Sequence, residues 1–193
     1  MKPSDVVSNV EVYGLERSIK VSKYPKAIDT DACTDDITSV TQSLAGCRTG
    51  TGHDNFLKGI IVQFDLTFTI KAWTEAERYH WFDIVSSQST MHCINRFDIE
   101  KQCIGYVDKG IIDIVKRYAE QYNADPTPEN YLRLLYNVPV GFRLTAGMST
   151  NYQQLKTMYQ QRKTHRLPEW KAFCAWIETL PHAEFITGNL KCQ

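Results

Sequence analysis

Residues 60–72 read Ile-Ile-Val-Gln-Phe-Asp-Leu-Thr-Phe-Thr-Ile-Lys-Ala. The stretch is rich in β-branched and aromatic residues, and its apolar side chains at Phe64, Leu66, Phe68 and Ile70 alternate with polar ones. Strict alternation is typical of a strand with one buried and one solvated face. The stretch therefore predicts one long strand, in a sheet that keeps a polar face.

Capping signals predict helices around this strand. A helix begins where a Ser, Thr, Asp or Asn side chain can accept from the first free amides, and proline is favoured at its first position. These rules predict helices over residues 37–46 (capped by Asp35 or Asp36), 74–86 (capping box at Thr74, with Tyr79, Trp81 and Phe82 in the core), 109–122 (capped by Asp108), 128–136, from Ser149 or Thr150 to 162, and from 168 onward. Further strands are expected at residues 138–145, 10–12 and 19–21. The order indicates a single α+β domain over residues 1–193.

Composition and charge narrow the function classes. The chain has 193 residues, 42% hydrophobic and 23% charged, which is typical of a globular protein and unlike a disordered one. Lys plus Arg and Asp plus Glu both number 22, so the net charge is zero and no general affinity for duplex nucleic acid is expected. The sequence has no apolar run of about 18 residues and begins without the apolar core of a signal peptide, so we expect no membrane span and a cytoplasmic location.

Several common site motifs are missing from the sequence. None of the six cysteines forms a C-x-x-C pair, so no metal site is predicted and most thiols are interpreted as free and buried. No Walker loop, Rossmann glycine motif, G-x-S-x-G or H-E-x-x-H occurs either.

Three polar stretches are candidates for ligand binding. Residues 86–92, Ser-Ser-Gln-Ser-Thr-Met-His, suit a phosphate or ribose, but equally an ordinary helix terminus. Residues 156–171 contain five Lys or Arg residues and one acidic residue, Glu169. This excess of positive charge suits carbonyl or phosphate recognition by arginine, but equally a solvated turn. The glycines before His53 allow close backbone approach to a ligand, although a lone histidine is more often structural.

Taken in order, these segments resemble the flavin-dependent (alternative) thymidylate synthases over residues 35–178. That family has a Gly-His loop, a strand ending in Lys-Ala, a helix with Arg-Gln-Trp, and the signature R-H-R-x-x-S-x-N-E-x-S-x-R-Y. Here Gly52-His53, then residues 67–72 (Thr-Phe-Thr-Ile-Lys-Ala) and 78–82 (Arg-Tyr-His-Trp-Phe) occupy the same places. The residues that match the signature are Ser89 and Arg96. Those that match the later part of the family pattern are Val138-Pro139, Arg143, Asn151 and Arg162.

The R-H-R triplet is the main departure from the family. It falls on Ile84, Val85 and Ser86, which carry no charge, while the Asn-Glu pair falls on Met91 and His92. In the family the triplet grips the flavin phosphates. Its absence removes two cationic partners of FAD, at about 1.5–3 kcal/mol for each charge-assisted bond.

The resemblance implies the family's α+β fold, a mixed sheet flanked by helices, assembled as a homotetramer with active sites between subunits. It implies an enzyme that transfers one carbon from folate to a pyrimidine nucleotide such as dUMP, with FAD as hydride carrier. The implied site is Arg162 as the catalytic residue at the uracil carbonyl, His53, Ser86, Ser89 and Asn151 on the cofactor, and His80, Gln88, His92, Arg96 and Arg143 on the substrate, with no metal ligand.

Two alternatives stay open from the sequence. In the first, the scaffold persists as a non-catalytic nucleotide-binding or protein-interaction module that has lost its grip on flavin. In the second, the ordered matches arise by chance in an unrelated α+β binding protein.

Overall fold

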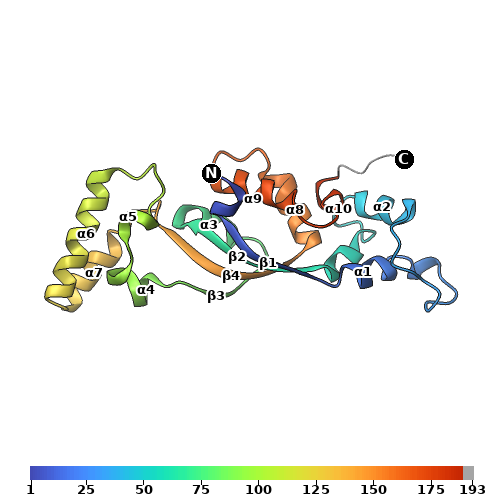
Figure 1. The fold of residues 1–193 in the computed structure, drawn as a ribbon, viewed down its shortest axis with the longest axis horizontal. Coiled ribbons are helices and arrows are strands. Elements are labelled where there is room, and N and C mark those ends of the chain that lie inside the picture. Colours follow the sequence, from blue (N-terminus) through green and yellow to red (C-terminus); the bar gives the residue numbers. More distant parts are fainter. Residues whose placement is uncertain (189–193) are drawn as a thin grey trace.

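The computed structural model describes residues 1–188, which form a four-stranded sheet with most helices on one side (Figure 1). The strands, in the order β1-β2-β4-β3 across the sheet, are β1 (Val7–Tyr13), β2 (Ile61–Thr69), β4 (Arg143–Asn151) and β3 (Phe82–Ser87). The α-helices are α1 (Leu15–Val21), α2 (Ser39–Gly46), α3 (Ile70–Ala76), α4 (Thr90–Cys93), α5 (Ile99–Gln102), α6 (Lys109–Ala124), α7 (Pro128–Tyr136), α8 (Tyr152–Arg162), α9 (Pro168–Ile177) and α10 (Glu184–Thr187). Short 3-10 helices are η1 (Pro3–Asp5), η2 (Tyr24–Lys26), η3 (Asn55–Gly59) and η4 (Ile94–Arg96).

The predicted α+β class is confirmed, with one correction to the sheet. A mixed sheet was expected, whereas all three strand pairs are antiparallel. β4 lies between β2 and β3 and runs opposite to both, and β1 runs opposite to β2, so no neighbouring strands are parallel.

β2 has the two faces that its alternation predicts. Phe64, Leu66 and Phe68 are buried on one face, while Gln63 is exposed on the other. The polar face also carries a hydroxyl pair, Thr67 and Thr145, whose side-chain oxygens lie 2.8 Å apart. The expected solvated face of the strand is thereby confirmed.

β2 and β4 pair along their whole length, from Ile61 opposite Asn151 to Thr69 opposite Arg143. β2 ends at Thr69, earlier than predicted, because the Thr69 hydroxyl accepts from the Ala72 amide at 3.2 Å and begins α3. The ends of this strand pair therefore set the starting points of α3 and α8.

α9 covers the buried face of β2 with aromatic side chains. The ring centres of Phe68 and Trp170 lie 5.0 Å apart, and those of Phe64 and Trp176 lie 4.6 Å apart. Phe173 is fully buried and contacts both strand phenylalanines, at 6.2 and 6.0 Å. The last predicted helix and its apolar face are confirmed.

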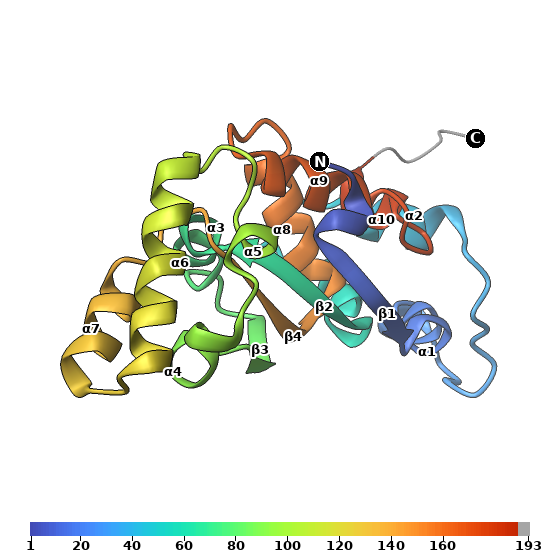
Figure 2. The same ribbon diagram turned by 60° about the vertical axis from the view of Figure 1, so that its left-hand side comes forward.

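Helices α4 to α7 form a second lobe with its own apolar core (Figure 2). Ile112 of α6, Leu134 of α7 and Phe142, just before β4, are buried in this core. Asp108 caps α6 as predicted, and both long helices end within two residues of their expected bounds. This lobe is the connection that separates β3 from β4 in the chain.

The predicted helix over residues 74–86 is wrong. α3 ends at Ala76, and residues 82–87 form β3, which pairs with β4 at the edge of the sheet. The β-branched character of this segment and its pairing with β4 outweigh the local capping signal. Phe82 is buried as expected, but Trp81 is 55% exposed instead of lying in the core.

The predicted boundaries of the next strand and helix also change. The strand expected over residues 138–145 is β4, which starts at Arg143 and extends to Asn151 because it pairs with all of β2. α8 is therefore capped by Asn151 rather than by either residue before it. The Asn151 side chain accepts from the Gln154 amide at 2.9 Å.

Two expectations near the beginning of the chain are wrong as well. Residues 19–21 lie in α1 instead of a strand, with Ile19 buried in the core. Thr38 caps α2 in place of the two aspartates before it, by accepting from the Thr41 amide at 3.3 Å. Residues 10–12 lie in β1, as expected.

Cys103 and Cys174 are buried free thiols, whereas Cys33, Cys47 and Cys93 are only partly buried. Cys192 lies outside the described residues. Among residues 1–188, no helix combines the length and the apolarity needed to cross a membrane.

A buried ion pair fastens α8 to the glycine-rich loop before β2. Lys156 Nζ donates to Asp54 Oδ2 at 3.0 Å and to the backbone carbonyls of Ala45 and Cys47. The other Asp54 oxygen accepts from Gln153 Nε2 at 2.8 Å. All three ammonium protons of the lysine are thus used, so this member of the basic stretch is structural.

We expect Phe173→Ala to lower the free energy of unfolding by about 3–5 kcal/mol, because it empties a fully buried site between β2 and α9. Urea denaturation measures the loss. Tyr136→Ala, on a side chain that is 80% exposed, is the matched control and should change stability little. Equal effects of the two variants would contradict the assigned core.

We expect Lys156→Met to lower the free energy of unfolding by about 3–5 kcal/mol, because it leaves the Asp54 carboxylate buried without its cation. Lys163→Met, at an exposed position one residue after α8, is the control. A loss below about 1 kcal/mol in the first variant would show that the pair does not fasten the loop.

Candidate functional site

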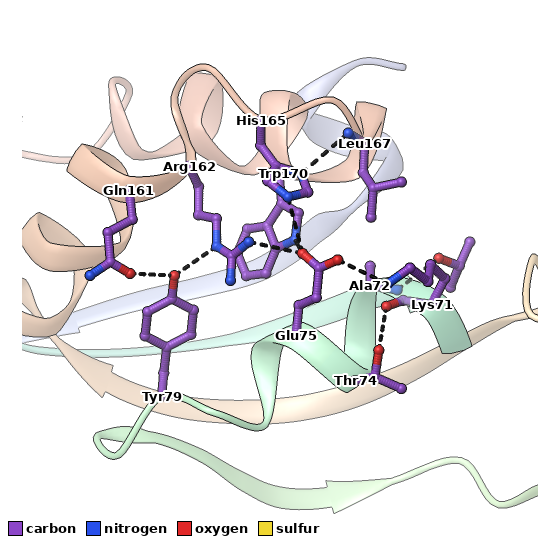
Figure 3. Close-up of polar contacts among 11 residues, drawn as sticks. Lys71, Ala72, Thr74, Glu75, Tyr79, Gln161, Arg162, His165, Leu167 and Trp170 are labelled. Atoms are coloured by element: carbon purple, nitrogen blue, oxygen red, sulfur yellow. Dashed lines mark hydrogen bonds and ion pairs between the residues drawn. The ribbon is translucent and has the colours of Figure 1, made fainter.

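Arg162, the predicted catalytic residue, ends α8 inside a cluster of polar and aromatic side chains (Figure 3). Its Nε donates to the Tyr79 hydroxyl at 2.7 Å, and its Nη1 donates to Glu75 Oε2 at 2.8 Å. The guanidinium carbon lies 4.7 Å from the centre of the Trp170 ring, and the arginine side chain is only 16% exposed. Two directed bonds and a stacked ring hold this guanidinium in one orientation.

Three donors converge on one carboxylate oxygen of Glu75. Arg162 Nη1, His165 Nε2 and Trp170 Nε1 lie 2.8, 3.2 and 3.1 Å from Oε2, and Lys71 Nζ lies 3.0 Å from Oε1. Burial raises the pKa of Glu75, but the hydrogen bond from Lys71 and the positive charges around the carboxyl outweigh burial and bring the pKa below its usual value. The group is therefore a carboxylate at neutral pH.

The contacts of His165 fix its tautomer. Its Nδ1 accepts from the Leu167 amide at 3.2 Å and so carries no proton, which leaves the proton on Nε2, facing Glu75. Nδ1 is thus engaged within the turn between α8 and α9, and Nε2 links this turn to Glu75 of α3.

Arg162 keeps donors for a ligand. The Tyr79 hydroxyl accepts a hydrogen bond from Arg162 and donates one to Gln161 Oε1 at 2.9 Å. Among the described residues, Nη2 has no hydrogen-bond partner, and in Figure 3 the guanidinium nitrogen without a dashed line lies between Tyr79 and Glu75. A fixed planar guanidinium with free N–H groups suits a carbonyl or an anionic oxygen.

A separate cleft lies between α1 and α2 and has a volume of about 1120 Å³. Tyr24, Leu44 and Phe56 give it an apolar lining, and Lys23 and Lys26 add positive charge. Ligand pockets of this kind measure about 300–1,000 Å³, so the cleft has room for a nucleotide. We refer to it below as the α1–α2 cleft.

His53 lines the α1–α2 cleft from the glycine-rich loop, and its side chain is exposed there. Gly50 and Gly52 have φ values of 94° and 83°, a backbone conformation that residues other than glycine rarely adopt. The buried Asp54 that follows anchors the loop to α8. The predicted cofactor residue therefore lies at a cavity, but Arg162 does not line it.

The polar run of residues 86–92 lies along the outer strand and not in a cavity. Ser86 is exposed on β3, and the Gln88 side chain accepts from a backbone amide of β4 at 2.9 Å. Ser89 directly precedes α4, and His92 lies exposed on that helix. The run mainly joins the sheet to the second lobe.

Two further predicted arginines bond to backbone carbonyls. Arg96 Nη2 donates to His92 O at 3.1 Å, within its own turn. Arg143 Nη2 donates to Lys101 O at 2.5 Å, and its Nε donates to Gln102 O at 3.3 Å. These contacts give both side chains local structural roles.

His80 and Asn151 lie apart from the other predicted residues. His80 is exposed, with its ring centre 4.6 Å from that of Trp81. Asn151 and Arg143 occupy opposite ends of β4, roughly 27 Å apart at about 3.4 Å per residue. The predicted residues thus do not converge on one site within a single chain.

No sequence pattern identified Glu75, Tyr79 or His165 as site residues. Glu75 follows Lys71 by four residues, a spacing that places both on one face of a helix. Its partner Arg162, however, is 87 residues away, and no local pattern reports such a contact. Among residues 1–188, no group of three or more His, Cys, Asp or Glu is placed to hold a metal ion.

Comparison by sequence identifies no relative, since no family model matches the chain and no curated protein is similar to it. Comparison by structure does find matches. The flavin-dependent thymidylate synthase ThyX from Helicobacter pylori, complexed with FAD and dUMP, superposes with a TM-score of 0.70 at 15% identity, over 95% of this chain and 100% of that one.

A second structure of ThyX from Helicobacter pylori, also with FAD and dUMP, gives a TM-score of 0.69 at 13% identity, over 94% of this chain and 98% of that one. Identities this low establish the fold alone. The fold expected from the order of sequence segments is therefore confirmed: this chain has the fold of the flavin-dependent thymidylate synthases.

Proposed function

We propose that this protein binds a pyrimidine nucleotide of the dUMP type, with Arg162 as the residue that contacts the base. The observation that carries the proposal is the fixed guanidinium of Arg162, which keeps Nη2 without a partner among the described residues. Its side chain is already ordered by Glu75, Tyr79 and Trp170, so little conformational entropy is lost when a ligand binds.

The fold supports the nucleotide class. Both Helicobacter pylori ThyX structures described above contain dUMP, and each match covers nearly the whole of this chain. The planar fork of an arginine is suited to the carbonyl oxygens of a pyrimidine. Nucleotide binding is accordingly the function that the fold and Arg162 favour together.

The residues at the predicted flavin positions do not fit FAD. β3 offers no cation for a diphosphate, and its one charged side chain is the carboxylate of Asp83. The Asn151 side chain is used to cap α8, and His53 lies at the α1–α2 cleft, away from Ser86 on the sheet edge. We therefore derive no reaction step through flavin.

A second candidate is a flavin-dependent enzyme that transfers one carbon to the nucleotide, with folate as donor. The α1–α2 cleft favours it, because a cavity of about 1120 Å³ with His53 and two lysines in its lining has room for a dinucleotide. The homotetramer implied by the family resemblance stays a prediction.

We expect Arg162→Lys to weaken dUMP binding roughly tenfold, equivalent to about 1.4 kcal/mol, because a lysine keeps the charge but loses the planar fork. Isothermal calorimetry measures the dissociation constant, and a thermal melt checks folding. Arg166→Lys, the same exchange at an exposed position in the next turn, is the control.

Equal binding by wild type and Arg162→Lys would remove Arg162 as the nucleotide contact. If the wild type binds neither dUMP nor other pyrimidine nucleotides, the proposed function itself falls.

Purified protein distinguishes the two candidate functions. A non-flavin nucleotide binder should be colourless, whereas a flavoenzyme absorbs near about 450 nm. We expect no such band, because β3 lacks the cations that would hold the cofactor phosphates. Mass spectrometry of released small molecules provides the second measurement, and recovery of stoichiometric FAD would favour the flavin-dependent enzyme.

A further inference from the structure

Glu75 is the charge that governs the environment of Arg162. Its carboxylate is 14% exposed, and Oε2 lies within 3.2 Å of three donors that come from α8, α9 and the turn between them. No other carboxylate forms an ion pair with Arg162 among the described residues. The position of Nη1 therefore depends on this one side chain.

The charges around the free edge of the guanidinium nearly cancel. Arg162 and Glu75 form a partly buried pair, whereas Lys71, the second cation on Glu75, has a side chain that is 53% exposed and is screened by solvent. His165 Nδ1 accepts from a backbone amide, and its Nε2 faces Glu75. An anion at Nη2 would lie beside the Glu75 carboxylate.

A neutral carbonyl avoids this repulsion but uses the same N–H donors. A carbonyl oxygen gains from the fixed direction of the fork and loses nothing to a nearby negative charge, whereas a phosphate dianion is repelled by it. The Glu75 carboxylate at Nη1 thus orients the Arg162 guanidinium and also repels negatively charged ligands.

We propose that Glu75 is a positioning residue that fixes the Arg162 fork and makes it select an uncharged carbonyl edge of a pyrimidine over a phosphate. The inference rests on the proposed function and deepens it, because it names Glu75 as the residue that makes Arg162 select the base over the phosphate. The nucleotide phosphate must then be held elsewhere.

The test compares wild type, Glu75→Gln and the control Glu77→Gln, which makes the same exchange at an exposed residue just after α3. Glutamine keeps the shape and an acceptor oxygen but removes the charge. The probes are deoxyuridine, which has the carbonyls without a phosphate, and inorganic phosphate. Calorimetry gives both dissociation constants, and ¹⁵N NMR of the Arg162 side chain reports its order without ligand.

For wild type and Glu77→Gln we expect deoxyuridine to bind at least tenfold more tightly than phosphate. In Glu75→Gln the preference should fall at least tenfold, through weaker deoxyuridine and tighter phosphate binding. The Arg162 Nε–H signal, resolved in the wild type, should broaden or shift to that of a freely rotating arginine. A Glu75→Asp variant, which restores the charge, should recover discrimination against phosphate.

Unchanged selectivity in Glu75→Gln, in a variant that melts like the wild type, would overturn the inference while leaving nucleotide binding intact. If the wild type binds dUMP but not deoxyuridine, the assignment of the uncharged carbonyl edge to Arg162 is overturned while the proposed function stands; if it binds neither dUMP nor other pyrimidine nucleotides, both fall. The NMR signal then decides positioning alone, and an ordered Arg162 in Glu75→Gln would overturn that part too.

Discussion

The antiparallel pairing of β2 with β4 is the constraint on which the rest of the structure depends. β2 delivers the chain to Thr69, where α3 starts, and β4 runs back from the opposite position to Asn151, where α8 starts. α8 then returns across the buried face, so its last residue, Arg162, meets Glu75 of α3. A shift of the register by one residue would turn the core face of β2 to solvent and would separate these two helices.

Arg162 illustrates how a packed environment changes what a charged side chain can do. On a surface helix end it would interact weakly with the helix dipole and with water. Here Trp170 stacks on one face, Tyr79 and Glu75 occupy two of its nitrogens, and the third remains available. Such a guanidinium is rigid before a ligand arrives, and its affinity for anions is reduced by the carboxylate beside it. Both properties favour recognition of a planar, uncharged group.

The scaffold and the individual site residues resemble the flavin-dependent thymidylate synthases to different degrees. The fold superposes on flavin-dependent thymidylate synthases over almost the entire chain, although identity is 15%. Cores tolerate extensive exchange of apolar residues when volume and pattern are kept, which explains a preserved fold at low identity. The missing cations of β3 cannot be replaced by exchanging apolar residues, because a bound diphosphate requires positive charge or amide donors near it. The α1–α2 cleft, with Lys23 and Lys26, is the part of the molecule that still combines room with positive charge.

The sequence by itself determined the features that depend on neighbours in the chain. The alternation in β2, the cap at Asp108 and the apolar face of α9 each follow from local rules and appear as expected. Tertiary structure decided where local signals were weak or conflicted. The stretch after Ala76 became β3 because β4 offered it hydrogen-bonding partners, and β4 extended to Asn151 because β2 was long enough to pair with it. The Glu75–Arg162 pair had no sequence signal at all, because it joins residues 87 positions apart through the path of two strands and a helix.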